Sequence, residues 1–448
     1  MNFIKLTMST IDSDVINKKE NVFENVQIEL QNKTERVNKQ SNSTSIENNI
    51  TDTKLPLPNT PNQLEQQQDL NENTQPITKP FLTTVSFLRG ISAVAIVFIH
   101  LNGPLPSTWR KKQFNHAYLA VDFFFLLSGY MTSYTVNPSK HFEPFSFLLK
   151  RIIRLQPMQV LSTLFGAFFF YLNNEKGDEF NLYKLICLTI VGCFTIPMPE
   201  NFSVINFNGF AYPLNGPAWT VLYEYIAALL FTTVFRFLNV IALCVLNVFF
   251  LYFIIDIAFN IDTFRLINGL GGELVKGWTF SFSHCYIAFS RLLFSFTTGL
   301  IIEKIPKKHE IKFGFIITLV SITVLYNIPY IQNKWARSIF DLCSVVIVFP
   351  CILLIATRSK IHSQFVQRIG NFLGEISYSM YLTHSYILGM FNVWGNNYGK
   401  DASLSMWIYL YIVMVFVPMV FGYSCWKLFD VPVRNLLRKK KSSLDSEK

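Results

Sequence analysis

The sequence contains few charged residues for its length. Asp, Glu, Lys and Arg make up only 15% of the 448 residues, whereas 50% of the residues are hydrophobic and 44 are phenylalanine. This composition excludes a soluble globular domain and indicates a protein embedded in a membrane. The net charge of +10 does not indicate nucleic-acid binding, because the basic residues lie in short loops beside apolar segments and in the terminal run Arg438–Lys441.

Cysteines are also few, and they form no pattern of a metal or disulfide site. No C-x-x-C motif occurs, and most of the seven cysteines lie within hydrophobic segments. We therefore expect no zinc site and no disulfide framework. The cysteines are Cys187, Cys193, Cys244, Cys285, Cys343, Cys351 and Cys425.

Residues 1–80 contain almost no aromatic residue and are rich in Asn, Gln, Thr, Ser and Glu. Such a segment buries too little apolar surface to offset its chain entropy, so we predict that it is disordered. It has no apolar core of a signal peptide, so the first hydrophobic helix is expected to act as the targeting signal. We therefore divide the chain into a cytoplasmic tail (1–80), a transmembrane domain (81–437) and a basic cytoplasmic C-terminal tail (438–448).

Ten hydrophobic segments that are long enough to span a bilayer follow the tail. Basic loop residues place both termini in the cytoplasm, although Arg110–Lys112 in the first outer loop count against this topology. On this topology the apolar run 182–196 does not cross, or crosses only as part of a re-entrant pair, and the glycosylation sequon at Asn201 lies outside. The expected fold is an all-α polytopic transmembrane helical bundle. The ten segments are 83–102, 117–135, 156–172, 216–237, 239–258, 285–303, 312–329, 337–357, 374–391 and 403–426.

The first of these segments carries two ionisable residues, Arg89 near its start and His100 near its end. Ionisable residues are costly inside a membrane and therefore indicate function. A spacing of eleven residues places both on one face of a helix, about 16 Å apart along its axis. The alternative without chemistry is an arginine that reaches the headgroups and a histidine bonded to a carbonyl of a neighbouring helix.

Two later segments each place a carboxylate among aromatic residues. Asp122 can orient His100, pair with Arg89, or form a buried ion pair without chemistry. Glu224 can serve as a general acid or base, or as the structural partner of an arginine. The other charges inside segments are expected to pair among themselves; they are Asp256, Arg291 and Asp341.

A pair of arginines follows the second segment. Arg151 and Arg154 are three residues apart and so share a helical face at the cytoplasmic surface. Two guanidinium groups on one face suit a diphosphate or a nucleotide 3′-phosphate. Anchoring by the positive-inside rule is the alternative interpretation.

A polar stripe lies on the segment 374–391. Ser377, Tyr381 and His384 occur at positions i, i+4 and i+7, so they share one helical face. Such a stripe lines either a cavity or another helix. His384 ranks below His100 as a catalytic candidate, because a membrane histidine is more often a hydrogen-bonded core residue.

Together these patterns resemble the acyltransferase-3 family of integral membrane O-acyltransferases, which includes bacterial polysaccharide and nodulation-factor acetyltransferases. The resemblance covers about residues 83–436, with Thr220 and Asp430 where the family usually has Ser and Glu. The matching motifs are Arg89 and His100 with ten residues between them, V-D-F-F-F-L-L-S-G (121–129), Arg151 and Arg154 with Pro157, W-T-V-L-Y-E (219–224), S-Y-S-M-Y-L-T-H (377–384), and Asp430, Pro432 and Arg434.

The resemblance implies transfer of an acyl group, usually acetyl, from cytoplasmic acyl-CoA to a hydroxyl of a carbohydrate or other acceptor at or across the membrane. Acyl-CoA would be a donor substrate, with no permanently bound cofactor and no metal. His100 would act as general base or acyl carrier, and Asp122 or Glu224 would fix its tautomer. Arg89 would hold donor phosphates with Arg151 and Arg154, or stabilise the oxyanion. The acceptor would contact Trp219, Ser377, Tyr381 and His384.

Two other functions are compatible with the same residues. A transporter or flippase would line its path with these charges, and a pseudoenzyme would sense acyl-CoA without transferring the group. The partners expected in every case are the lipid bilayer and small molecules, not nucleic acid. The Asn-rich tail indicates an endomembrane or plasma membrane of a eukaryote rather than a bacterial envelope.

Overall fold

The computed structural model describes residues 82–101, 114–136, 141–173, 182–199, 210–267, 269–307, 309–398 and 403–446. Within these residues the regular elements are helices, joined by two isolated β-bridges, Pro199 with Phe280 and Phe210 with Thr279. The all-α prediction is therefore confirmed. The predicted disordered tail (1–80), the sequon at Asn201 and the basic run Arg110–Lys112 lie outside the described residues.

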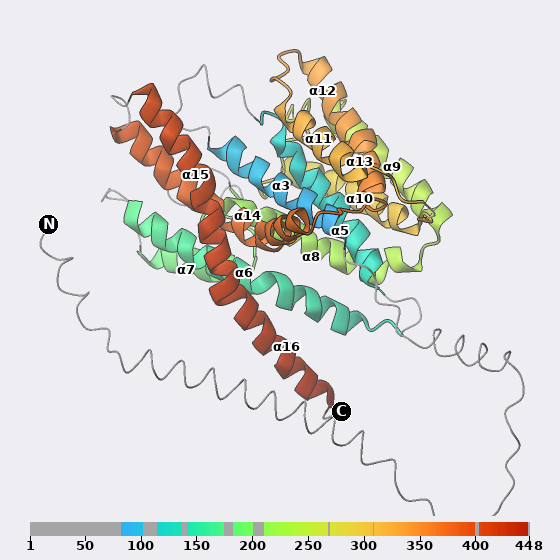
Figure 1. Cartoon of the computed structure of the whole chain (residues 1–448), viewed down its shortest axis with the longest axis horizontal. Coiled ribbons are helices and arrows are strands. Elements are labelled where there is room, and N and C mark those ends of the chain that lie inside the picture. The colour runs from blue at the N-terminus through green and yellow to red at the C-terminus, as the bar shows by residue number, and fades with distance from the viewer. Residues whose placement is uncertain are drawn as a thin grey trace, which may run out of the picture. The chain divides into compact units, whose positions relative to one another are not determined.

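Figure 1 shows two groups of helices on either side of α3, α5 and α8, one formed by α9 to α13 and the other by α6, α7 and α15. The α-helices are α3 (Thr83–His100), α5 (Ala120–Thr135), α6 (Pro144–Asn173), α7 (Leu182–Cys193), α8 (Trp219–Thr233), α9 (Val240–Ala258), α10 (Phe282–Lys304), α11 (Gly314–Asn327), α12 (Lys334–Cys343), α13 (Phe349–Ala356), α14 (Gln364–Tyr398), α15 (Leu404–Cys425) and α16 (Val431–Ser446). Short 3₁₀ turns (Ala117–Leu119, Gly216–Ala218, Phe235–Phe237) and π turns (Ser344–Val348, Trp426–Asp430) extend or join them.

Each of the ten predicted segments overlaps one of these helices or a continuous run of them. Among the described residues, seven helices or runs are long and apolar enough to cross a membrane. The predicted segments 117–135, 312–329 and 374–391 are not among the seven. Helices α5 and α11 have only 16 and 14 residues, and α14 carries the polar stripe.

Helices α3 and α14 form the most extensive contact in the bundle. Glycines allow it, because a Cβ on Gly90 would lie 2.5 Å from Leu373 and a Cβ on Gly374 would lie 2.8 Å from Ser86. Arg89 is opposite Gly374, and His100 is opposite His384. The two helices therefore run parallel and in register over about three turns.

Helices α5 and α10 form a second close parallel pair. A Cβ on Gly129 would overlap the carbonyl oxygen of Phe296. The absence of a side chain at Gly129 therefore allows the two helices to approach closely. The pair runs parallel, since Asp122 bonds to Arg291 near the start of α10 and Ser133 donates to Glu303 near its end.

Helix α7 enters the bundle antiparallel to α6. Leu185 packs in a hydrophobic cluster with Phe170, near the C-terminus of α6. At the other end of α7, the side-chain amide of Gln156 donates to the carbonyl of Cys193. Helix α7 therefore reaches from the C-terminal end of α6 to a point deep in the bundle.

The chain then returns to the end of the bundle from which α7 entered. Met198 N–H donates to Ala211 O (2.8 Å), and Ala211 N–H donates to Trp278 O (3.0 Å), just before α10. Helix α10 starts at the end where α6 finishes, because Arg151 of α6 donates to Thr132 near the C-terminus of the parallel α5. The run 182–196 therefore does not cross the bundle, and it forms the re-entrant arrangement that was one of the two predicted.

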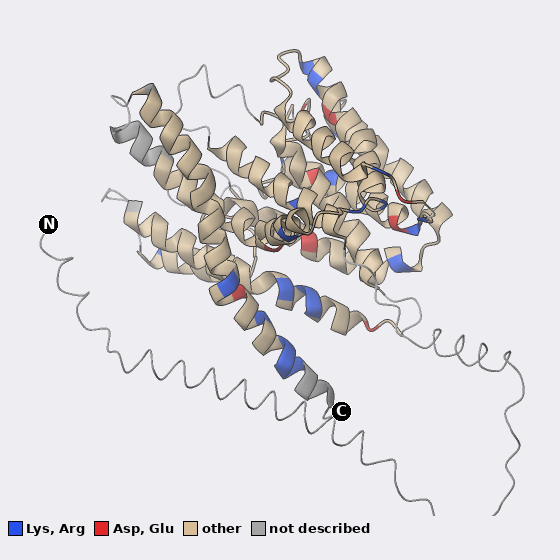
Figure 2. Cartoon of the chain, viewed as in Figure 1, with Lys and Arg blue, Asp and Glu red and all other residues tan. Residues whose placement is uncertain are grey.

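Elements predicted to be cytoplasmic meet at one end of the bundle, which we call the basic end. Lys441 of α16 donates to Ser146 in the first turn of α6. Arg358, after α13, donates to the carbonyl of Pro306, after α10 (3.3 Å). Figure 2 shows Lys and Arg residues along the N-terminal half of α6 and along α16. The cytoplasmic position of this end stays a prediction.

The α5–α10 contact predicts the effect of a single methyl group. Gly129→Ala places a Cβ on the Phe296 carbonyl, so the two backbones must separate and the protein should lose about 1–3 kcal/mol of stability. The measurement is the melting temperature of detergent-purified protein. Gly389→Ala on α14 is the control, because a Cβ there meets no atom within 4 Å. Equal melting temperatures for the two variants would contradict the role given to this contact.

Candidate active site

Arg89 and His100 both face α14, which confirms the shared face predicted from their spacing. The Nη2 of Arg89 donates to the carbonyl of Gly374, while its buried Nε has no partner. About three turns further along, the ring of His100 lies 5.1 Å from the ring of His384, with 39° between the ring planes. Helix α3 therefore presents a cation at one level of α14 and an imidazole at another.

The two imidazoles differ in their surroundings. His384 is fully buried, and its Nδ1 lies 2.6 Å from the carbonyl oxygen of Tyr381. Its Nε2 is buried without a partner, whereas the side chain of His100 is exposed. The sequence interpretation ranked His384 below His100 as a catalytic candidate and assigned it to acceptor binding. The structure places the rings of the two histidines side by side.

The other residues of the predicted acceptor set lie at different levels. The Tyr381 hydroxyl is hydrogen-bonded to that of Thr220 (3.2 Å), near the imidazole pair. The Ser377 hydroxyl donates to the carbonyl of Gly374 (2.8 Å), the same acceptor that Arg89 uses. Ser377 thus lies at the height of Arg89 along α14, which we call the arginine level. The polar stripe runs from this level to the level of the two imidazoles.

Trp219 lies apart from this stripe. Its indole packs edge-on against Phe125 and Tyr223. The guanidinium of Arg291 lies 5.9 Å from its ring. The predicted contact between Trp219 and the acceptor therefore gains no support from its position, which is beside a buried ion pair.

Glu224 lies among the arginines of the basic end, not beside His100. Its Oε2 accepts a hydrogen bond from Ser128 (2.7 Å), and its charge acts on both Arg89 and Arg151. Of the two roles considered for it, the structure favours that of a partner for arginines. The prediction that Glu224 fixes the tautomer of His100 is wrong in this arrangement, because the two residues lie at different levels.

Arg151 and Arg154 differ in exposure. Arg151 is half-buried, donates to Thr132 and stacks over the ring of Phe147 (5.4 Å). Arg154 is exposed, and its charge acts on Arg89 and Arg151. Glu224 acts on two of these three guanidinium groups and Glu375 acts on Arg89, so the positive charge is only partly balanced, an arrangement that suits a bound anion.

Asp430, at the end of the last π turn, and Arg434 of α16 extend this cluster, and the sequence interpretation did not include them in the site. Asp430 is buried and accepts a hydrogen bond from Arg434 (2.7 Å). The charges of Arg154 and Arg438 also act on this pair. The sequence signal for them was the closing motif Asp430, Pro432 and Arg434, which matches the family that the chain resembles.

Asp122 is engaged in a buried ion pair. Its two oxygens accept hydrogen bonds from the Nε (3.0 Å) and Nη2 (2.7 Å) of Arg291, and both residues are fully buried. Arg291 also donates to the carbonyl of Lys276 (2.8 Å). The predictions that Asp122 orients His100 or pairs with Arg89 are wrong, because both carboxylate oxygens are bonded elsewhere. The third reading, an ion pair without chemistry, fits the structure.

The expected pairing of Asp256, Arg291 and Asp341 with one another is also wrong. Asp256 accepts hydrogen bonds from Thr263 and Tyr286. Asp341 accepts from the Tyr118 hydroxyl (2.7 Å) and from the Leu274 N–H (3.0 Å). Hydroxyl and backbone donors, which carry no charge, satisfy these carboxylates.

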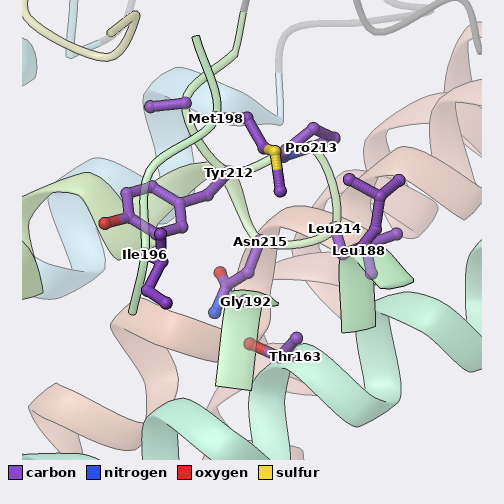
Figure 3. Close-up of a pocket in the computed structure, with 10 residues that line it drawn as sticks. Thr163, Leu188, Gly192, Ile196, Met198, Tyr212, Pro213, Leu214 and Asn215 are labelled. Atoms are coloured by element: carbon purple, nitrogen blue, oxygen red, sulfur yellow. The ribbon is translucent and has the colours of Figure 1, made fainter. Parts of the chain in front are cut away.

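A pocket lies where α7 meets α6 and the chain that leads into α8 (Figure 3). The side chain of Asn215 lines it and donates to Ser162 (2.6 Å), but its buried Oδ1 has no partner. The buried Oε1 of Gln159 in α6 has no partner either. These two acceptors suit a hydroxyl or a water molecule. The pocket is lined by Thr163, Leu188, Gly192, Ile196, Met198, Ala211, Tyr212, Pro213, Leu214 and Asn215.

A family model described as an acyltransferase domain matches residues 83–426. This range begins at the start of α3 and includes both imidazoles, Arg89, Arg151, Arg154 and Glu224. Asp430 and Arg434 lie just beyond it. No curated protein and no solved structure matches the chain.

The buried ion pair predicts a structural defect. Asp122→Ala leaves the Arg291 guanidinium buried without its partner, which should cost about 3–5 kcal/mol of stability. The measurement is the amount and melting temperature of folded protein after size-exclusion chromatography. Glu310→Ala, which breaks the exposed pair with Lys360, should change neither quantity. If Asp122→Ala has normal stability but no activity, the role of Asp122 is chemical and not structural.

Proposed function

The chain belongs to the acyltransferase family whose model matches residues 83–426, and from this premise we propose that it is a membrane O-acyltransferase. It moves an acetyl group from acetyl-CoA to a hydroxyl of a carbohydrate or other acceptor. The observation that carries the proposal is the parallel contact of α3 with α14, which sets a partly unsatisfied arginine and a pair of imidazoles about 16 Å apart on one wall.

The arginines of the basic end bind the phosphates of the donor. Arg89 retains a buried Nε–H without a partner, and Arg154 is exposed. An anion near them would offset the repulsion of Arg154 with Arg89 and Arg151, which Glu224 and Glu375 balance only in part. The long flexible arm of the donor then runs along α3 and brings the thioester to His100.

The chemistry takes place at the exposed imidazole. A ring nitrogen of His100 takes the proton of the acceptor hydroxyl, and the oxygen attacks the carbonyl carbon of the thioester. When the carbon–sulfur bond breaks, the CoA thiolate takes the proton from the imidazolium. In the other route considered, His100 first accepts the acetyl group itself and then passes it to the acceptor.

The oxyanion role considered for Arg89 does not suit this geometry. Arg89 lies about 16 Å from His100 along α3, so it is far from a carbonyl that reacts there. The Tyr381 hydroxyl is closer to the imidazole pair, and its proton can turn from its neighbour Thr220 (3.2 Å) toward a developing negative charge. We assign Tyr381 to the oxyanion of the tetrahedral intermediate.

The proposal predicts loss of transfer without loss of the protein when His100 is removed. His100→Ala should lower transfer by at least about 100-fold, because the acceptor hydroxyl loses its base, while the protein still inserts and accumulates. The measurement is incorporation of radiolabel from acetyl-CoA into membranes that contain the full chain, followed by identification of the labelled product. His141→Ala is the control, because His141 is exposed near the start of α6. Full activity of His100→Ala would show that the base for the reaction is not on α3.

The donor site predicts a dependence on the 3′-phosphate of CoA. Arg154→Ala should raise KM for acetyl-CoA by about 10-fold, since a charge-assisted hydrogen bond to phosphate is lost. The same variant should change KM much less with 3′-dephospho-acetyl-CoA. Lys360→Ala removes an exposed cation of the basic end, which already pairs with Glu310, and should affect neither donor. An equal change for both donors would place Arg154 away from the 3′-phosphate.

A further inference from the structure

We propose that His384 orients His100 for acetyl transfer, in the role that a carboxylate fills in other histidine-dependent sites. The inference rests on the proposed function and names a positioning residue within it. It starts from the ring pair, whose centroids lie 5.1 Å apart, close enough that a rotation of the exposed His100 brings nitrogens of the two rings within hydrogen-bonding reach.

The tautomer of His384 follows from the hydrogen bond that its Nδ1 makes to the backbone. The partner of Nδ1 is the backbone carbonyl of Tyr381, at 2.6 Å, and a carbonyl oxygen only accepts. Nδ1 therefore carries the proton, and in the neutral ring Nε2 carries the lone pair. That lone pair is buried without a donor, a state that costs stability unless a partner reaches it.

No carboxylate in the described part of the chain competes for this role. Both oxygens of Asp122 are bonded to Arg291, and Glu224 bonds to Ser128 at the level of the arginines. The hydrogen bonds and ion pairs of the described residues join neither His100 nor His384 to an acid. The N–H donor that suits Nε2 of His384 is thus the other imidazole.

The difference in exposure indicates which ring contacts the substrate and which ring orients the other. The exposed His100 can touch a substrate, whereas His384 is fully buried on α14. In this arrangement one nitrogen of His100 donates its N–H to Nε2 of His384, so the other nitrogen holds the lone pair that takes the acceptor's proton. When His100 becomes charged, the same hydrogen bond strengthens and stabilises the imidazolium.

Two amide substitutions separate this role from a structural one. Gln at position 384 places an amide oxygen near the former Nε2, and Asn places an amide group near the former Nδ1. If His384 acts through Nε2, the kcat of His384→Gln is higher than that of His384→Asn. The kcat of His384→Ala falls by about 100-fold. KM for acetyl-CoA stays unchanged in all three variants. If His384 serves only through its bond to Tyr381, Asn retains more activity than Gln.

The measurement is kcat for acetyl transfer with the full-length protein in membranes, divided by the amount of folded protein from size-exclusion chromatography. Tyr386→Phe on the same helix is the matched control, because it removes a buried hydroxyl and keeps the ring that stacks on Phe169 (5.1 Å). Its kcat should equal that of the unsubstituted protein. A protein without transfer activity before any substitution would reject the proposed function, whereas an active protein in which Asn equals or exceeds Gln would reject the role of His384 alone.

Discussion

The parallel contact of α3 with α14 is the constraint on which the candidate site depends. It joins segments almost 300 residues apart in the chain, and it is close because Gly90, Gly370 and Gly374 leave room for the facing helix. A slip of one residue would turn the facing side chains by about 100°. Such a slip would break the bond of Arg89 to Gly374 and the ring contact of His100 at the same time, so one packing register sets both levels of the site.

Buried polar groups of the site and its surroundings differ in how fully their hydrogen bonds are satisfied. In a bilayer an unsatisfied polar group is costly, and the Asp122–Arg291 pair meets this demand with two bonds between the side chains and a further bond to a carbonyl. Arg89 and His384 do not meet it, since each retains a buried nitrogen without a partner. Groups left incomplete in this way are where a ligand or a catalytic partner gains most.

Local periodicity was sufficient to predict which residues share a helix face. The spacing of Arg89 and His100 placed both toward one neighbour, and both indeed face α14. The loop charges predicted that the run 182–196 does not cross, or crosses only as part of a re-entrant pair. Partners between helices could not be predicted in this way, because they depend on which faces meet. Asp122 bonds to a residue 169 positions away, and no local pattern distinguishes Arg291 from Arg89 as its partner.

The separation of charge along α3 suits a donor that has a charged head and an uncharged arm. Phosphates lose the least hydration near the surface. Arg154 is exposed there, and it lies close enough to Arg89 on α3 for the two charges to interact. A thioester and its arm carry no charge, so they can move deeper at a smaller cost than the phosphates. In the proposed reaction, the positive charge that forms on His100 is stabilised by its fixed neighbour His384. A site with the arginines and imidazoles at one level would lose this advantage, because the phosphates would have to follow the thioester into the bundle.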